Sequence, residues 1–278
     1  MLEPFGARLR AATDKLGPFC VGIDPHPAVL TDWRLPDDPT GLERFTMTCV
    51  EALAGQVGVV KPQSSFFERH GSAGIAVLEK AVLEFRSSGT LVLLDAKRGD
   101  IGSTMQGYAD AYLDQTSPLA VDAITVHPFL GFGSVQPVID TAQAQGAGVF
   151  VLALTSNPEG PEVQSARIGD GTVAGHVLAS ITAVNNTASR GSLGSIGAVV
   201  AANLGRLTED VAIGGPLLAP GFGAQGGTAA DLARLFGGVV EVVLPSSSRA
   251  VLQSGPTVAA LRAAALRTND DVVRALRR

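Results

Sequence analysis

The chain has 278 residues, of which 46% are hydrophobic and 17% charged, and its formal net charge is −5. This length exceeds that of a small domain, but a (β/α)8 barrel uses about 250 residues as one unit. The negative net charge and the lack of a Lys/Arg run argue against nucleic acid as a partner. Because the net charge would repel an anionic ligand, such a ligand would need a local cationic pocket.

The sequence has few features that indicate a cellular compartment. Residues 1–17 predict a short amphipathic helix without the apolar stretch of a signal peptide. No run of about 18 apolar residues predicts a membrane span. Cys20 and Cys49 lie on apolar stretches and are interpreted as core residues, although a single disulfide stays open. We therefore expect a cytoplasmic protein with no membrane contact.

Short apolar runs recur along the chain and predict buried strands, because they are continuous rather than alternating. The runs are residues 19–24, 58–63, 91–97, 123–127, 149–156, 198–203, 217–221 and 239–248. Helical patterns lie between them, such as the spacing of Leu42, Phe45, Cys49 and Leu53. The alternation predicts one domain over residues 1–278, a (β/α)8 TIM barrel preceded by the N-terminal helix. An open doubly wound sheet remains the alternative.

Polar residues follow the predicted strands at one end, where a (β/α)8 barrel carries its active site. They include Asp24, Lys61, Asp95, Lys97, His127, Thr155, Ser156, Asn203 and residues 246–249. The longest polar stretch, residues 157–175, is either an ordinary surface loop or a cover over the site.

The most informative cluster combines acids and lysines. Asp95 and Lys97 are two residues apart on a predicted strand and should point to the same face. Asp100 follows after a short turn, and Lys61 comes from the preceding predicted strand. Adjacent carboxylates favour the ammonium form, so Lys97 could act as a proton donor. Alone, this spacing would more often be a salt-bridge network.

A predicted anion site favours a functional role for this cluster over a structural salt-bridge network. Residues 220–227 form a Gly-rich segment, and residues 246–248 with Arg249 precede a predicted helix. Glycines allow the backbone to approach an oxyanion, while a helix N-terminus and an Arg side chain bind phosphate. The loops after strands seven and eight are the frequent phosphate site of (β/α)8 barrels.

The segment Asp95-x-Lys97-x-x-Asp100-Ile101-Gly102-x-Thr104 resembles the active-site signature of the orotidine 5′-phosphate decarboxylase family. Residues 21–27, 60–71, 93–104 and 245–252 are similar to its longer bacterial branch, type 2. The resemblance implies a lyase that converts orotidine 5′-phosphate to UMP and CO2 in pyrimidine biosynthesis, with neither metal nor cofactor.

The resemblance also implies roles for single residues. Lys97 would protonate the pyrimidine, Asp95 would lie beside the leaving carboxylate, and Lys61 would hold the network. Asp100 and Thr104 would reach into the partner subunit's site, which implies a homodimer. The implied substrate contacts are Asp24 with the ribose, Ser156 with the pyrimidine, and Gln225 and Arg249 with the phosphate.

Other functions predict other residues. A sister phosphosugar decarboxylase or aldolase of the same superfamily would use Mg²⁺ and need acidic ligands, but strand two ends in Lys61-Pro62-Gln63. A Schiff-base aldolase needs a neutral lysine, which the flanking acids oppose. A non-catalytic phosphate-ligand sensor would have lost the charge cluster. None of the four histidines has metal-ligand spacing.

Overall fold

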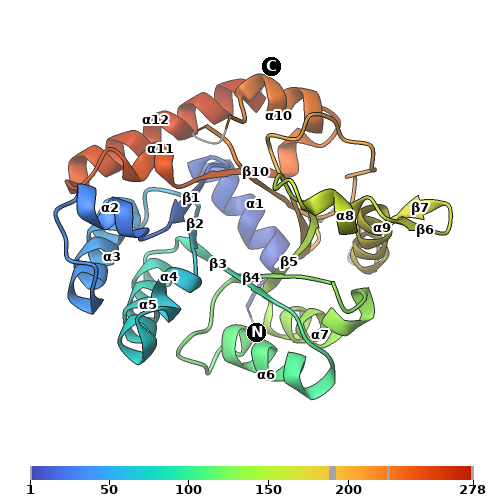
Figure 1. The fold of residues 1–278 in the computed structure, drawn as a ribbon, viewed down its shortest axis with the longest axis horizontal. Coiled ribbons are helices and arrows are strands. Elements are labelled where there is room, and N and C mark those ends of the chain that lie inside the picture. Colours follow the sequence, from blue (N-terminus) through green and yellow to red (C-terminus); the bar gives the residue numbers. More distant parts are fainter. Residues whose placement is uncertain (1, 188–191, 224–225, 277–278) are drawn as a thin grey trace.

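The computed structural model describes residues 2–187, 192–223 and 226–276 and shows a closed barrel of eight parallel strands (Figure 1). The barrel strands are β1 Cys20–Ile23, β2 Val59–Pro62, β3 Leu91–Arg98, β4 Ala123–Val126, β5 Gly148–Leu154, β8 Ile196–Val200, β9 Leu217–Pro220 and β10 Val243–Ser247. Because β1 pairs with both β2 and β10, the sheet has no edges. The predicted barrel is confirmed, and the open sheet is excluded.

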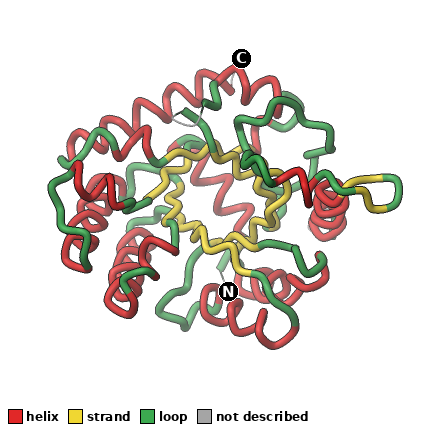
Figure 2. Tube along the Cα trace, viewed as in Figure 1, coloured by secondary structure: helices red, strands yellow, loops and turns green. Residues whose placement is uncertain are grey.

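Helices surround the strands, except for the first helix, which lies across one end of the barrel (Figure 2). They are α1 Phe5–Leu16, α2 Pro27–Asp32, α3 Pro39–Leu53, α4 Ser65–Glu68, α5 Gly71–Ser87, α6 Gly102–Leu113, α7 Gln136–Gln145, α8 Gly160–Gln164, α9 Val173–Asn185, α10 Ala229–Phe236, α11 Arg249–Leu252 and α12 Val258–Leu276. Most of these helices, but not α1, contribute apolar side chains to the larger core, together with the outward side chains of the barrel strands. In α3 the predicted stripe from Leu42 to Leu53 is buried, and the Asp38 side chain caps the helix by accepting from Gly41 N. Among the described residues, no helix combines the length and the apolar character that a membrane span requires.

The predicted start of the last strand was wrong. Residues 239–242 do not begin the last strand, because Val240–Val242 forms a 3₁₀ turn and β10 starts at Val243. Glu241 is exposed there, which a strand buried on both faces would not allow. The polar stretch 157–175, interpreted as a surface loop or a cover over the site, is mostly exposed and contains α8 and a hairpin of β6 Arg167–Ile168 and β7 Gly171–Thr172. The two cysteines are buried and unbridged.

Helix α1 closes the bottom of the barrel, at the amino-terminal ends of the strands. Phe5 and Leu9 pack with the inward side chains of the strands, and the Phe5 ring meets Phe150 edge-on at 6.0 Å. Glycine is required at position 148 because a Cβ there would lie 2.3 Å from the Phe5 ring. The predicted helix is therefore confirmed, and its Phe5 and Leu9 side chains belong to the inner core of the barrel.

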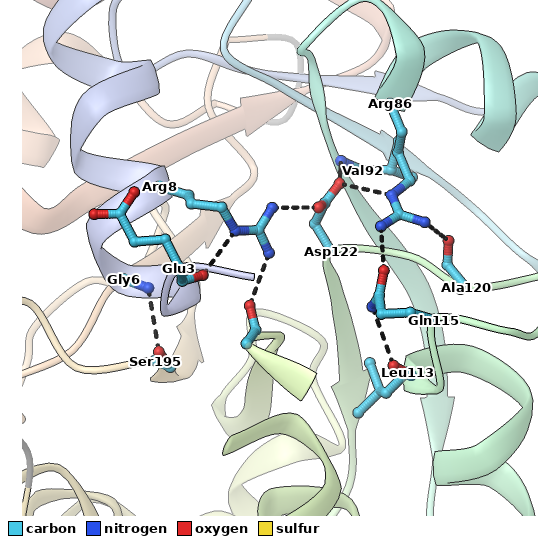
Figure 3. A network of polar contacts seen from close by, with 11 residues as sticks. Glu3, Gly6, Arg8, Arg86, Val92, Leu113, Gln115, Ala120, Asp122 and Ser195 are labelled. Atoms are coloured by element: carbon cyan, nitrogen blue, oxygen red, sulfur yellow. Dashed lines mark hydrogen bonds and ion pairs between the residues drawn. The ribbon is translucent and has the colours of Figure 1, made fainter. Parts of the chain in front are cut away.

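A buried carboxylate fastens this helix to the barrel (Figure 3). Asp122 precedes β4, and its Oδ1 accepts from Arg8 Nη1 of α1 at 2.5 Å. Its Oδ2 accepts from Val92 N at 2.9 Å and lies 3.6 Å from Arg86 Nε. Arg8 also donates to the Gly146 carbonyl at 2.8 Å. One carboxylate thus joins α1, β3 and the start of β4.

Removing this carboxylate should destabilise the fold. Asp122→Ala leaves cationic partners unpaired and an amide unsatisfied, so the unfolding free energy should fall by about 3 kcal/mol. Urea denaturation followed by circular dichroism measures the change. Asp271→Ala is the control, because the Asp271 side chain is 64% exposed against 4% for Asp122. The control should lie within about 0.5 kcal/mol of the wild type, and equal effects of the two variants would contradict the interpretation.

Candidate active site

A cavity of about 640 Å³ opens at the carboxyl-terminal ends of the strands. Asp24, Lys61 and Asp95 line it, together with residues 246–248 and Arg249. The polar ends of β1, β2, β3 and β10 therefore converge, whereas Lys97, His127, Thr155, Ser156 and Asn203 are not among the residues that line this cavity. The cavity has the size of a small-molecule site.

The centre of the polar side is the Asp95 carboxylate of β3. Its Oδ2 accepts from Lys61 Nζ of β2 at 2.9 Å, and its Oδ1 accepts from Lys97 Nζ at 2.5 Å. Thr125 Oγ1 of β4 donates to Oδ1 at 2.9 Å. Three donors from three adjacent strands thus hold one carboxylate, and both of its oxygens are occupied.

The charges of this cluster depend on one another. Burial opposes the ionised form of Asp95, but the Lys61 and Lys97 ammonium groups outweigh it and hold the pKa of Asp95 well below its usual range. Burial also opposes the charge of Lys61, whereas Asp95 and Asp24 raise the pKa of Lys61 above its usual value. Lys61 and Asp95 are therefore ionised at neutral pH.

The backbone of β3 is irregular where these residues lie. The register between β3 and β4 shifts between Leu94 and Arg98, and Lys97 has a left-handed conformation with φ of 47°. A regular strand would place Asp95 and Lys97 on one face, as the sequence predicted. The two side chains do meet, but through a bulge that the sequence did not indicate.

Asp24, just after β1, forms a second carboxylate in the cavity. Ser248 Oγ donates to Asp24 Oδ2 at 2.5 Å, while Asp24 Oδ1 is buried without a partner among the described residues. Gly22 makes room for this contact, because a Cβ there would lie 2.1 Å from Ser248 Oγ. The unsatisfied oxygen points to a ligand hydroxyl or amide as its natural donor. Ser248 was missed as a supporting residue because it was interpreted only as a phosphate contact.

The predicted phosphate end is built from β10 and the short helix that follows it. Arg249 begins α11, is exposed and lines the cavity with residues 246–248. In the loop after β9, Gly221 and Gly223 have φ of 93° and 75°, a conformation that favours glycine, and Gly221 and Phe222 line the same cavity. Gln225, the other predicted phosphate contact, lies outside the described residues.

Three predicted site residues are not part of this cluster within one chain. Asp100 accepts a hydrogen bond from Ile101 N at 2.8 Å and has no ion pair with any described residue. Thr104 is exposed on α6. Ser156 is exposed after β5 and does not line the cavity. Among the described residues, no hydrogen bond or ion pair joins any of these three to Asp95 or Lys97.

Comparison with known proteins identifies a family. The family model described as "Orotidine 5'-phosphate decarboxylase / HUMPS family" matches residues 17–264. An orotidine 5′-phosphate decarboxylase of a Nocardioides species is 61% identical over 97% of this chain and 98% of its own length. One of Streptomyces coelicolor is 58% identical over 95% of both chains. A crystal structure of a Streptomyces avermitilis protein given the same name has a TM-score of 0.97 and 58% identity, covering 100% of this chain and 97% of that one.

The dependence of the unfolding free energy on acidic pH should reveal the charge of Asp95. Since its pKa is lower in the folded than in the unfolded chain, its stabilisation is complete above about pH 4 and is lost as pH falls through the folded value. Asp95→Asn should therefore show a shallower fall in unfolding free energy between about pH 4 and pH 2 than the wild type.

Chemical denaturation at several pH values measures these slopes. Asp271→Asn, at an exposed carboxylate, should keep the slope of the wild type. If Asp95→Asn is too unstable, adding Lys61→Met removes the buried ammonium that has lost its partner. Equal slopes for Asp95→Asn and the wild type would contradict an ionised, paired Asp95.

Proposed function

The chain belongs to the orotidine 5′-phosphate decarboxylase / HUMPS family, and from this premise we propose that it converts orotidine 5′-phosphate to UMP and CO2 in pyrimidine biosynthesis. The observation that carries the proposal is the Asp95 carboxylate, held ionised between Lys61 and Lys97 beside a cavity that extends to Arg249. The proposal includes neither a metal nor a cofactor, and it treats residues 1–278 as one domain.

The charge cluster supports both halves of a decarboxylation. A substrate carboxylate about 4 Å from Asp95 is repelled by roughly 4 kcal/mol at an effective dielectric near 20, and the repulsion ends when CO2 leaves. The Lys97 ammonium stabilises the electron pair left on the pyrimidine carbon and then donates a proton to that carbon. Lys61 keeps Asp95 in place during this change of charge, because it remains paired with Asp95 on the side away from Lys97.

The rest of the cavity fits the rest of the nucleotide. The unpartnered Oδ1 of Asp24 can accept from a ribose hydroxyl. Arg249 and Gln225 are proposed to hold the phosphate, and Ser156 the pyrimidine. Binding energy gained at the phosphate is available to the transition state at the ring, because the two ends belong to one molecule.

A homodimer in the cytoplasm is part of the same proposal. Ile101, which lies between Asp100 and Thr104 in the sequence, and Phe129 and Leu130, which follow β4, are exposed apolar residues. Burying them against a second copy would carry Asp100 and Thr104 toward the partner subunit's site. Two buried, unbridged cysteines are compatible with a reducing compartment.

Turnover should depend on Lys97 and not on a metal. The purified chain should consume orotidine 5′-phosphate, followed by ultraviolet absorbance, at equal rates with and without EDTA. Lys97→Ala should lose turnover by at least about 100-fold and still bind UMP in calorimetry. Lys80→Ala is the control, because Lys80 pairs with Glu43 on the outer helices. Loss of activity in EDTA would favour the Mg²⁺-dependent sister enzyme, and UMP binding without turnover by the wild type would favour the sensor.

The shared site predicts complementation between subunits. Asp100→Ala and Lys97→Ala should each be inactive, because each removes one member of every site. A mixed dimer would contain one site with both changes and one intact site, so mixing the two proteins should restore up to about half of the activity per mixed dimer. Size-exclusion chromatography checks the dimer, and mixing either variant with itself is the control. No recovery in a confirmed mixed dimer would place Asp100 in the site of its own chain.

A further inference from the structure

Thr125 of β4 faces the bulge that carries Asp95 and Lys97. Ile124 and Val126, its neighbours in sequence, pair with Leu94 and Arg98 of β3. Residues 95–97 of β3 therefore lie opposite the single residue Thr125 of β4. The regular ladder between the two strands is interrupted at this point, and the Thr125 side chain occupies the interruption with 1% exposure.

The Thr125 hydroxyl joins the backbone of the bulge to the charge cluster. Lys97 N donates to Thr125 Oγ1 at 3.0 Å, and Thr125 Oγ1 donates to Asp95 Oδ1 at 2.9 Å. The directions are fixed, because an amide N–H only donates and an ionised carboxylate only accepts. One hydroxyl thereby replaces the missing ladder bond of Lys97 and restricts the rotation of the Asp95 carboxylate.

We propose that Thr125 is a positioning residue for the decarboxylation: its hydroxyl holds the Lys97 backbone and the Asp95 carboxylate in the arrangement that brings their charges together at the cavity. This inference rests on the proposed function. It adds a residue that touches neither the cavity nor the reacting atoms, since Thr125 is buried and does not line the cavity.

Packing alone does not fix Lys97. Its side chain is 46% exposed, so the position of its ammonium depends on Asp95 and on its own backbone. That backbone is left-handed, a conformation that is unfavourable for an L-residue and needs a compensating contact. On the outer side of β3, Arg98 is held by Glu68 and Tyr112. On the inner side the Thr125 hydroxyl provides the contact.

Substitutions at position 125 test this role through kinetics. Thr125→Val keeps the shape and removes the hydroxyl, so kcat for orotidine 5′-phosphate should fall on the order of 100-fold, as small misplacements of reacting groups do. The KM and the affinity for UMP should change little, because Asp24 and Arg249 are untouched. Thr125→Ser keeps the hydroxyl and should recover most of the kcat.

Thr90→Val is the matched control. Thr90 is also 1% exposed, and its hydroxyl also accepts from an amide, Gly55 N at 2.8 Å, and lies 3.2 Å from the Val57 carbonyl. It lies at the opposite end of the barrel, so Thr90→Val should lower the melting temperature but not the kcat. If Thr125→Val does not fold, Thr125→Cys replaces the hydroxyl with a weakly bonding thiol and carries the same expectation.

The outcomes separate the two proposals. A wild type that decarboxylates orotidine 5′-phosphate, with Thr125→Val at wild-type kcat, overturns the role of Thr125 alone. The same holds if Thr125→Ser is as slow as Thr125→Val, or if Thr90→Val lowers kcat equally. A wild type without decarboxylase activity overturns the proposed function and the role of Thr125 with it.

Discussion

The site depends on one buried carboxylate that is charged because two ammonium groups reach it. An isolated carboxylate in a protein interior would take up a proton, since burial of an unpaired charge costs several kcal/mol. Asp95 avoids this because β2 and β3 are neighbours in the barrel, so Lys61 and Lys97 approach opposite oxygens. Closure of the barrel then sets Asp24 and Arg249 around the same cavity.

Each end of the barrel has a buried carboxylate between two cationic side chains, but the two clusters have different roles. At the bottom, Asp122 lies between Arg8 and Arg86, whose guanidinium groups also bond to backbone carbonyls and do not give up protons. At the top, Asp95 lies between two lysines, whose ammonium groups can transfer a proton. The cluster at the lower end is therefore suited to holding helix α1 in place, and the cluster at the upper end is suited to proton transfer in catalysis.

Much of the fold and of the site could be predicted from the sequence. Apolar runs separated by helical stripes predicted the eight strands, because parallel strands buried on both faces have a distinct composition. The acids and lysines at the strand ends predicted the cluster of Lys61, Asp95 and Lys97. The bulge at Lys97 and the contact of Thr125 could not be predicted, because a register shift depends on the pairing of two strands. The 3₁₀ turn before β10 was missed because valines at 239–243 have the propensity of a strand.

A crystal structure with UMP bound would test the central claim most directly, which is that Lys97 faces the reacting carbon. We expect Lys97 Nζ within roughly 3–3.5 Å of C6 of the pyrimidine, the distance of a near-attack arrangement, with the phosphate bound by Arg249. A pyrimidine ring at the far end of the cavity, or an Asp95 side chain turned away from Lys97 when UMP is bound, would contradict it.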